Sequence, residues 1–296
     1  MDTLRRILEQ ADTGGFAIGH FNVSDLVTVN AVFEAARDLQ VPVVVGVSEG
    51  ERRFMGVRQV SAVVKSLREE YGFPIFLNAD HTHSLQSAIE AAQAGFDWIV
   101  FDVSTLPFED NLRQTKAAVE ALKAIRPDIL VEGEIGDIGS GSEIHDAAPD
   151  LQKGLTSPVQ AKQFFEETRV DTLAPAVGNM HGMLKSMLAG AAKKRLDIQR
   201  IGAIKAETRA FMTLHGASGT DDNDLRKAIA AGITVVHINT EVRLAWRRGL
   251  DQALAKQPGE IVPYKILPQV DDAIKQVVTA RLKLFSEGRR ARPASV

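Results

Sequence analysis

Short strand-like runs alternate with helical patterns along most of the chain, and this alternation is the feature that most limits how the chain folds. There are eight such runs, and most of them are apolar on both alternating faces, which is typical of parallel strands buried on both sides. They are FAIGHFNV (16–23), PVVVGVSE (42–49), PIFLNADH (74–81), DWIVFDVS (97–104), DILVEGEI (128–135), TLAPAVGN (172–179), FMTLHGAS (211–218) and TVVHINTE (234–241). Segments with apolar residues at three- and four-residue spacing, such as LQSAIEAAQAGF, lie between them. Eight such units predict an α/β fold, a closed (β/α)8 TIM barrel, with a doubly wound open sheet as the alternative.

The length of 296 residues suits one barrel domain, which we expect to span residues 1–286. The last ten residues, EGRRARPASV (287–296), are predicted to be a disordered tail. Two connections are long for this fold: residues 136–156, and residues 183–210, where GAAKKRLDIQR (190–200) is predicted to be a basic helix. Long strand-to-helix loops at the active face of a barrel often act as lids.

Composition excludes several classes of function. The net charge of −3 gives no general attraction to nucleic acids or membranes. The chain has no cysteine, so disulfides, thiolate catalysis and cysteine-ligated zinc are excluded, and a transition-metal site must use histidines and carboxylates. The N-terminal stretch lacks the apolar centre of a signal peptide, and no apolar run approaches the length of roughly 20 residues that spans a membrane. We therefore expect a cytoplasmic protein.

Four of the seven histidines fall near the predicted C-terminal ends of strands, where barrels place catalytic groups. His81 ends the third strand, His181 lies just past the sixth, His215 is near the end of the seventh and His237 is on the eighth. A single histidine at such a position is more often a hydrogen-bonded structural residue than a metal ligand. Three imidazoles that leave one position open are, however, a common arrangement for catalytic zinc.

Carboxylates occupy neighbouring strand ends. Asp80 precedes His81, Asp102 ends the fourth strand, and Glu132 and Glu134 end the fifth. A metal held among such groups can polarise a carbonyl oxygen and stabilise a developing enolate. The residues therefore predict a metal site beside a proton-transfer group, although Co²⁺ or Fe²⁺ would suit these ligands as well as Zn²⁺.

Glycine and hydroxyl residues accompany the histidines in the motifs HGMLK, HGASG and NTE. Backbone amides freed by glycine, hydroxyl donors and a lysine suit a phosphate group, and loops after the seventh and eighth strands of barrels often bind one. Each glycine motif is weak alone, because glycine also makes ordinary turns. The residues concerned are Gly182, Lys185, Gly216, Ser218, Gly219 and Thr240.

The motifs FNVSD, VSEG, ADH, DVSTLPFEDNLRQT, VEGEIG, DTLAPAVGNMHG, LHGASG and NTE occur in this order between residues 16 and 245. Together they resemble the class II, metal-dependent fructose-bisphosphate and tagatose-bisphosphate aldolases. The resemblance implies a TIM barrel that forms a homodimer or homotetramer. It also implies a lyase of glycolysis and carbohydrate metabolism, which reversibly cleaves a ketose 1,6-bisphosphate, most often fructose 1,6-bisphosphate. The products are dihydroxyacetone phosphate and glyceraldehyde 3-phosphate, formed through a metal-stabilised enediolate.

The resemblance also implies roles for individual residues. His81, His181 and His215 match the zinc ligands, and Asp102 and Glu134 match carboxylates that hold the metal in an alternate or second divalent site. Asp80 matches the acid/base that exchanges a proton with the C4 hydroxyl.

Further matching positions surround the substrate. Asn22 and Ser48 match substrate-pocket positions, with Ser48 near the second phosphate. The positions that match those around the first phosphate and a monovalent cation, Na⁺ or K⁺, are Gly182, Lys185, Gly216, Ser218 and Thr240.

The chain departs from the family pattern at several positions. Asn78 stands where a histidine is frequent, and Thr82 stands where glycine is usual. In DIGSGSEIHD, Glu143 is the best match to the acid/base that reprotonates C3. On the eighth strand, Val235 and His237 replace a lysine and an asparagine, so we expect His237 and its neighbour Asn239 in the substrate pocket.

Three functions remain open. The leading hypothesis is a zinc-dependent ketose-bisphosphate aldolase. The second is a related metal-dependent aldolase or lyase that acts on another phosphorylated sugar, such as tagatose bisphosphate, and the changes at Val235 and His237 motivate it. The third is a non-catalytic barrel that binds a sugar phosphate or a metal.

Overall fold

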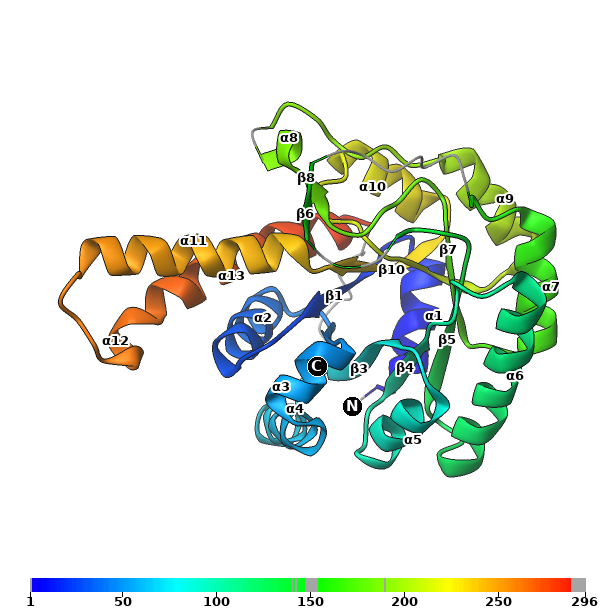
Figure 1. The fold of residues 1–296 in the computed structure, drawn as a ribbon, viewed down its shortest axis with the longest axis horizontal. Coiled ribbons are helices and arrows are strands. Elements are labelled where there is room, and N and C mark those ends of the chain that lie inside the picture. The colour runs from blue at the N-terminus through cyan, green and yellow to red at the C-terminus, as the bar shows by residue number, and fades with distance from the viewer. Residues whose placement is uncertain (1, 140, 142, 147–153, 189, 289–296) are drawn as a thin grey trace, which may run out of the picture.

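The computed structural model describes residues 2–139, 141, 143–146, 154–188 and 190–288. Eight parallel strands close into a barrel in the order β1-β10-β9-β7-β5-β4-β3-β2 (Figure 1). The strands are β1 (Ile18–Asn22), β2 (Val43–Val47), β3 (Ile75–Thr82), β4 (Trp98–Phe101), β5 (Leu130–Ile135), β7 (Thr172–Pro175), β9 (Phe211–Leu214) and β10 (Ile233–Ile238). Each overlaps one of the eight predicted runs, so the (β/α)8 barrel is confirmed and the open sheet is wrong.

Helices surround the barrel, and many begin at a side chain that caps free backbone amides. Thr3, Asp25, Ser84, Asp197 and Asp221 accept such hydrogen bonds, and Ser48 and Ser157 form full capping boxes. The helices are α1 (Leu4–Gly14), α2 (Leu26–Leu39), α3 (Glu49–Met55), α4 (Val57–Tyr71), α5 (Leu85–Gln93), α6 (Phe108–Ile125), α7 (Pro158–Thr168), α8 (Lys185–Leu188), α9 (Ile198–Thr208), α10 (Asp222–Ala230), α11 (Thr240–Lys256), α12 (Pro263–Ile266) and α13 (Pro268–Phe285).

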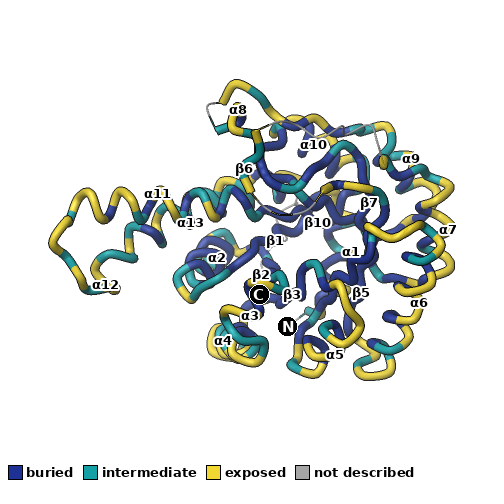
Figure 2. The backbone as a smooth tube through the Cα atoms, viewed as in Figure 1, coloured by how far each residue is buried: buried dark blue, intermediate teal, exposed yellow. Residues whose placement is uncertain are grey.

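Helix α1 closes the end of the barrel at which the strands begin. Its apolar residues, such as Leu8, share one core cluster with Val44, Trp98, Leu130 and Val235, which stand early on four different strands. The strands and this plug are buried, whereas the outer faces of the helices are exposed (Figure 2). The opposite end of the barrel, where the strands finish, is therefore the end available for a site.

Residues two apart along a strand face the same side, and the inward-facing series turns polar toward the open end. On β3 the series runs Phe76, Asn78, Asp80, and on β5 it runs Leu130, Glu132, with Glu134 following. All of these side chains are buried. Buried polar groups must be paired with one another or with a ligand, so this end of the barrel interior is built for polar contacts.

The two long connections pair with each other. Strands β6 (Ile144–His145) and β8 (Met183–Leu184) form a separate two-stranded parallel sheet. Residues 140, 142 and 147–153 of the predicted lid lie outside the described residues. The predicted basic helix over 190–200 is wrong for most of its length, because residues 190–197 are not helical and α9 begins only at Ile198. Gly190 has φ 72°, which a helix does not allow, and Asp197 caps the new start by accepting from the Arg200 amide.

At the C-terminus, the described chain extends two residues beyond the expected domain boundary. Glu287 forms an ion pair with Arg226. The rest of the predicted tail, residues 289–296, lies outside the described residues. No helix in the described part of the chain combines the length and the apolar character needed to cross a bilayer.

Candidate active site

The end of β3 carries a bulge that turns two consecutive side chains toward the same place. In the pairing with β4, Ala79 lies opposite Ile99 and Thr82 lies opposite Phe101, so two residues of β3 face one residue of β4. His81 has φ 42°, in the left-handed region that L-residues rarely adopt. In a regular strand consecutive side chains point to opposite faces. The bulge therefore explains how both Asp80 and His81 line one pocket.

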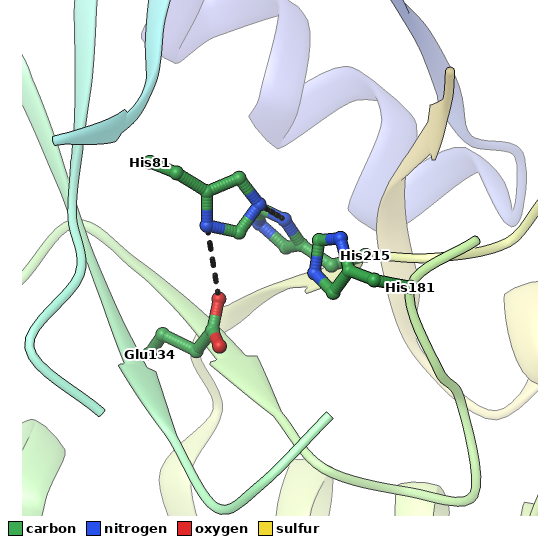
Figure 3. Close-up of side chains that lie close together, drawn as sticks. All are labelled: His81, Glu134, His181 and His215. Carbon is green, nitrogen blue, oxygen red and sulfur yellow. Dashed lines mark hydrogen bonds and ion pairs between the residues drawn. The ribbon is translucent and has the colours of Figure 1, made fainter. Parts of the chain in front are cut away.

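Three histidines from distant parts of the chain converge at this end of the barrel (Figure 3). His81 ends β3, while His181 follows β7 and His215 follows β9. The ring of His81 lies 4.7 Å from that of His181 and 4.8 Å from that of His215, between centroids. His81 Nε2 and His215 Nδ1 face each other at 3.2 Å. Lone pairs that converge in this way are suited to a shared cation.

Two carboxylates hold the outer nitrogens of these rings. His81 Nδ1 donates to Asp102 Oδ2 at 2.8 Å, and His215 Nε2 donates to Glu132 Oε1 at 2.6 Å. The Ser104 hydroxyl and amide anchor Asp102 in turn. Such bonds fix the tautomer and the orientation of a ligand ring, and they leave its inner nitrogen free to bind metal.

Glu134 completes a group of four potential ligands. Its Oε2 lies 3.7 Å from His81 Nδ1, and ligand atoms of His81, Glu134, His181 and His215 all lie within 4.8 Å of one another. Within the described part of the chain, neither His181 Nε2 nor Glu134 Oε2 has a hydrogen-bond partner, although both atoms are buried. Buried polar atoms without partners are costly, so this donor set fits a divalent ion such as zinc.

The electrostatics of the cluster also depend on its burial. Burial alone would lower the pKa of His81, but the carboxylates of Asp80 and Asp102 outweigh it and raise this pKa to about 10. Burial and the neighbouring Asp102 raise the pKa of Glu134 to about 8. Burial and the charge of His81 hold the pKa of His181 well below its usual range. The cluster therefore carries protons that a bound metal ion would replace.

Asp80 stands next to the histidines with one oxygen anchored and one uncommitted. Its Oδ2 accepts from Asn22 Nδ2 at 2.9 Å, and the same amide donates to Glu51 Oε2. Its Oδ1 is 3.5 Å from His237 Nδ1 and 3.8 Å from His81 Nε2. Burial opposes ionisation, but His81 and His237 hold the pKa of Asp80 well below its usual range. The carboxylate is thus positioned to accept a proton.

His237 occupies the barrel interior beside this acid. It faces His20 in the pairing of β1 with β10, and the two rings stack in parallel with centroids 3.4 Å apart. Its ring also lies 4.1 Å from that of His215. Potential ligand atoms of His237 lie within 4.8 Å of those of His20 and Asp80, and also of those of Glu132 and His215. His237, which stands where the family pattern has an asparagine, therefore lies in the site and contacts both Asp80 and the ring of His215.

One pocket brings together most of the residues that the sequence singled out. It is lined by Asn22, Asp80, His81, His181, Gly182, His215, Gly216, Ser218, His237, Asn239 and Thr240. Gly182 and Gly216 have φ 72° and 61°, and a Cβ atom on Gly216 would lie 2.3 Å from the Met180 carbonyl oxygen. Only glycine lets these two loops approach so closely.

Several predicted residues lie outside that pocket lining. Lys185 is exposed and pairs with Asp146 at 2.5 Å across the β6–β8 sheet. Glu143 is exposed in the loop before β6, and Ser48 caps α3 through its hydroxyl oxygen. Asp102 and Glu134 also lie outside the lining, but their carboxylates lie next to Nδ1 of His81, at 2.8 Å and 3.7 Å.

Sequence reasoning missed two residues that the structure ties to the site. Glu51 bonds Asn22 and pairs with Arg243, and the capping-box spacing from Ser48 to Glu51 was the available signal. Lys194 is buried under the glycine loops, although its segment was predicted to be a basic helix. No local pattern distinguishes it from its neighbours Lys193 and Arg195.

Comparison with known proteins is consistent with this geometry. A sequence model of the family "Fructose-bisphosphate aldolase class-II" matches residues 2–289. The fructose-bisphosphate aldolase of Thermus caldophilus is 33% identical over 96% of this chain and 98% of its own length. That of Geobacillus stearothermophilus is 32% identical, over 98% of each chain. The crystal structure of the YdjI aldolase from Escherichia coli K12 aligns over 98% of both chains with a TM-score of 0.82 and 27% identity.

Proposed function

The chain belongs to the class II fructose-bisphosphate aldolase family, and we propose that it cleaves fructose 1,6-bisphosphate reversibly to dihydroxyacetone phosphate and glyceraldehyde 3-phosphate. The convergence of His81, His181 and His215 beside Asp80 is the observation that carries this proposal. Two of the rings are already oriented by carboxylates, so the site is preorganised for a metal. In this proposal the enzyme is a lyase that forms no Schiff base with its substrate.

His81, His181 and His215 would hold the divalent ion, with Glu134 as a further ligand or as part of a second divalent site. When bound, the ion would supply a Lewis acid that polarises the C2 carbonyl and stabilises the negative charge left on that fragment. Asp102 and Glu132 would keep the ligand rings in place throughout the reaction. Zinc is the ion we propose, because three histidines with an open position suit it.

Asp80 would act as the general base of cleavage. It takes the proton of the C4 hydroxyl as the C3–C4 bond breaks, while the bonding electron pair remains on the fragment that bears the C2 carbonyl. The hydrogen bond from Asn22 fixes the carboxylate through Oδ2 and leaves Oδ1 for the substrate. A second group must then return a proton to C3, and Glu143 stays our proposal for that group.

The glycine loops would bind the phosphate of the dihydroxyacetone half. Gly182, Gly216, Asn239 and Thr240 line the pocket that contains the histidines. Ser218 accepts hydrogen bonds from the amides of Asn239 and Glu241, and its hydroxyl would donate its proton to the phosphate. Thr240 begins α11, and the start of a helix favours an anion. Ser48 stays our proposal for contact with the second phosphate.

His237 is a specific reason to keep a second substrate in view. Its ring lies against Asp80 and His215, where the resemblance places an asparagine. A larger and differently hydrogen-bonding side chain at this point would change which sugar configuration fits. We therefore keep as the second candidate the cleavage of another phosphorylated sugar, such as tagatose bisphosphate.

A homo-oligomer in the cytoplasm completes the proposal. Helices α11, α12 and α13 form an arm that projects from the barrel (Figure 1). On and beside α12, Ile261 and Tyr264 are 87% and 77% exposed. Apolar side chains this exposed at the tip of an arm support a contact with a second copy of the chain. A homodimer or homotetramer would cover them.

The decisive experiment is cleavage of fructose 1,6-bisphosphate, tagatose 1,6-bisphosphate and unphosphorylated ketoses by the zinc-loaded enzyme. We expect cleavage of a bisphosphate that a chelator abolishes and added zinc restores, and we expect borohydride to trap no adduct. Cleavage that resists the chelator would contradict the role of the metal. Full zinc loading without turnover of any ketose bisphosphate would favour the non-catalytic barrel.

A further inference from the structure

Lys194 is a buried lysine under the glycine loops of the pocket. It lies in the extended segment before α9, and only 2% of its surface is exposed. Its backbone is fixed on both sides, because its amide donates to the Gly219 carbonyl at 3.0 Å and its carbonyl accepts from the Asp221 amide at 3.1 Å. The side chain therefore starts from a rigid point beside the HGASG loop.

The ammonium group of Lys194 is surrounded by backbone oxygens. It donates to the carbonyls of Met180 at 2.8 Å, Gly182 at 2.5 Å and Gly216 at 2.8 Å. These three bonds use all three of its protons. Among the described residues, no Asp or Glu forms an ion pair with it. Burial lowers the pKa of Lys194 to about 7, and the three neutral carbonyl oxygens hold its charged form at the loops without contact with a carboxylate.

The three carbonyls come from the two loops that line the candidate phosphate site. Gly182 and Gly216 line the pocket, and Met180 precedes the potential ligand His181. Their close approach requires glycine, since a Cβ on Gly216 would lie 2.3 Å from the Met180 carbonyl oxygen. Several carbonyl oxygens that converge on one point are the arrangement with which proteins replace the hydration shell of an alkali cation. Here a side chain of the chain itself fills that position.

We propose that the Lys194 ammonium is a built-in cation of the phosphate site, and that it takes the place of the Na⁺ or K⁺ expected from the resemblance. In its charged form it ties the two loops together and places a positive charge beside the bound phosphate. Lys194 is a positioning residue, because its protons are committed to the loops and not to the reacting atoms. The inference rests on the proposed function to the extent that a substrate phosphate binds between these loops.

The first test compares monovalent cations with the zinc-loaded wild-type enzyme. The enzyme is exchanged into a buffer whose only monovalent cation is tetramethylammonium, which is too large for the carbonyl cage. We expect the KM and kcat for fructose 1,6-bisphosphate to stay unchanged when potassium, sodium or ammonium chloride replaces tetramethylammonium chloride at constant ionic strength. Activation of the wild type by potassium would overturn the proposal without the need for any variant.

The second test opens the cage. In Lys194→Ala we expect KM to rise about tenfold or more in tetramethylammonium, the scale of a lost charge-assisted contact. Potassium or ammonium should restore much of the loss by entering the vacated space. Lys194→Met is the matched variant, because its side chain fills the cage without a charge, and it should be as weak as Lys194→Ala but not rescued. Lys193→Ala, at the exposed neighbour, should behave as the wild type.

A readout independent of turnover is the thermal midpoint. Potassium should raise the Tm of Lys194→Ala and leave that of the wild type unchanged. Inorganic phosphate should raise the Tm of the wild type more than that of Lys194→Met. Lys194→Ala that matches the wild type in KM and Tm without potassium would overturn the proposal. A different outcome would separate the two proposals. If phosphate stabilises the protein only when Lys194 is present, but the protein cleaves no ketose bisphosphate, the role of Lys194 at the phosphate site would stand and the proposed aldolase activity would be wrong.

Discussion

Glu132 accepts a hydrogen bond from His215 Nε2 at 2.6 Å, and its other oxygen accepts from the hydroxyls of Thr172 and Thr213. The carboxylate therefore sits at the centre of a buried network that joins β5, β7 and β9. Because the bond fixes Nε2, it turns Nδ1 of the same ring toward His81. A residue that does not line the pocket thus sets the direction of a potential metal ligand.

Replacing this carboxylate should weaken metal binding. For Glu132→Gln we expect zinc affinity to fall by about 10- to 100-fold, because the ring is less firmly oriented and less basic. Competition with a chromophoric chelator measures the change. Glu120→Gln, on the exposed face of α6, is the matched control and should bind zinc as the wild type does. Equal zinc affinity in the two variants would contradict the orienting role.

Asp80→Asn separates proton transfer from metal binding. The amide preserves the size of the side chain but cannot accept the C4 proton, so we expect kcat to fall by about a hundred- to ten-thousand-fold. Zinc content, measured by atomic absorption on the same sample, should stay at the wild-type level because the three histidines remain. Unchanged turnover would show that another group is the base.

Zinc binding to the metal-free protein should become tighter as the pH rises. The pKa of His81 is raised to about 10 and that of Glu134 to about 8, so both groups hold protons at neutral pH when no metal is bound. Zinc must displace these protons, and raising the pH through about 8 removes part of the competition. Calorimetric titrations in buffers with different ionisation enthalpies should show net proton release at pH 7, and less release at pH 9. Binding without proton release would contradict the assignment.

Gly216→Ala should perturb the proposed phosphate-binding loop in two ways, through backbone strain and through a steric clash. Its φ of 61° is unfavourable for alanine, and the new Cβ would lie 2.3 Å from the Met180 carbonyl oxygen. We expect lower stability and a higher KM. Gly15→Ala is matched for strain, since Gly15 has φ 66°, but a methyl group added there would meet no other atom within 4 Å. That control should lose about 1–2 kcal/mol of stability and keep the wild-type KM.

The barrel and the histidine cluster follow from the sequence for one physical reason. Parallel strands buried on both faces have long apolar runs, so their polar ends are conspicuous. His81, His181 and His215 each stand at or just beyond such an end, and closure of the barrel brings those ends together. Local pattern and global fold point to the same place.

The positions of loop residues follow less directly from the sequence. Lys185 and Glu143 match family positions in loops, and the structure places Lys185 outward against Asp146 beside the pairing of β6 with β8 and leaves Glu143 exposed, so the roles proposed for them stay predictions. The KKRLD segment reads as a helix from composition, yet Lys194 is drawn inward by three carbonyls from distant loops. Contacts of this kind are set by tertiary structure and leave no periodic signal in the chain.

The bulge at the end of β3 has a consequence for any attempt to redesign this protein. Adjacent positions of β3 hold the proposed proton acceptor, Asp80, and a potential metal ligand, His81, and the extra residue of the bulge lets both side chains line one pocket. Deleting one residue there would restore a regular ladder and send one of the two side chains toward the helices. The proposed acid and the potential ligand therefore share one pocket only because of the bulge, and a regular strand would keep no more than one of them there.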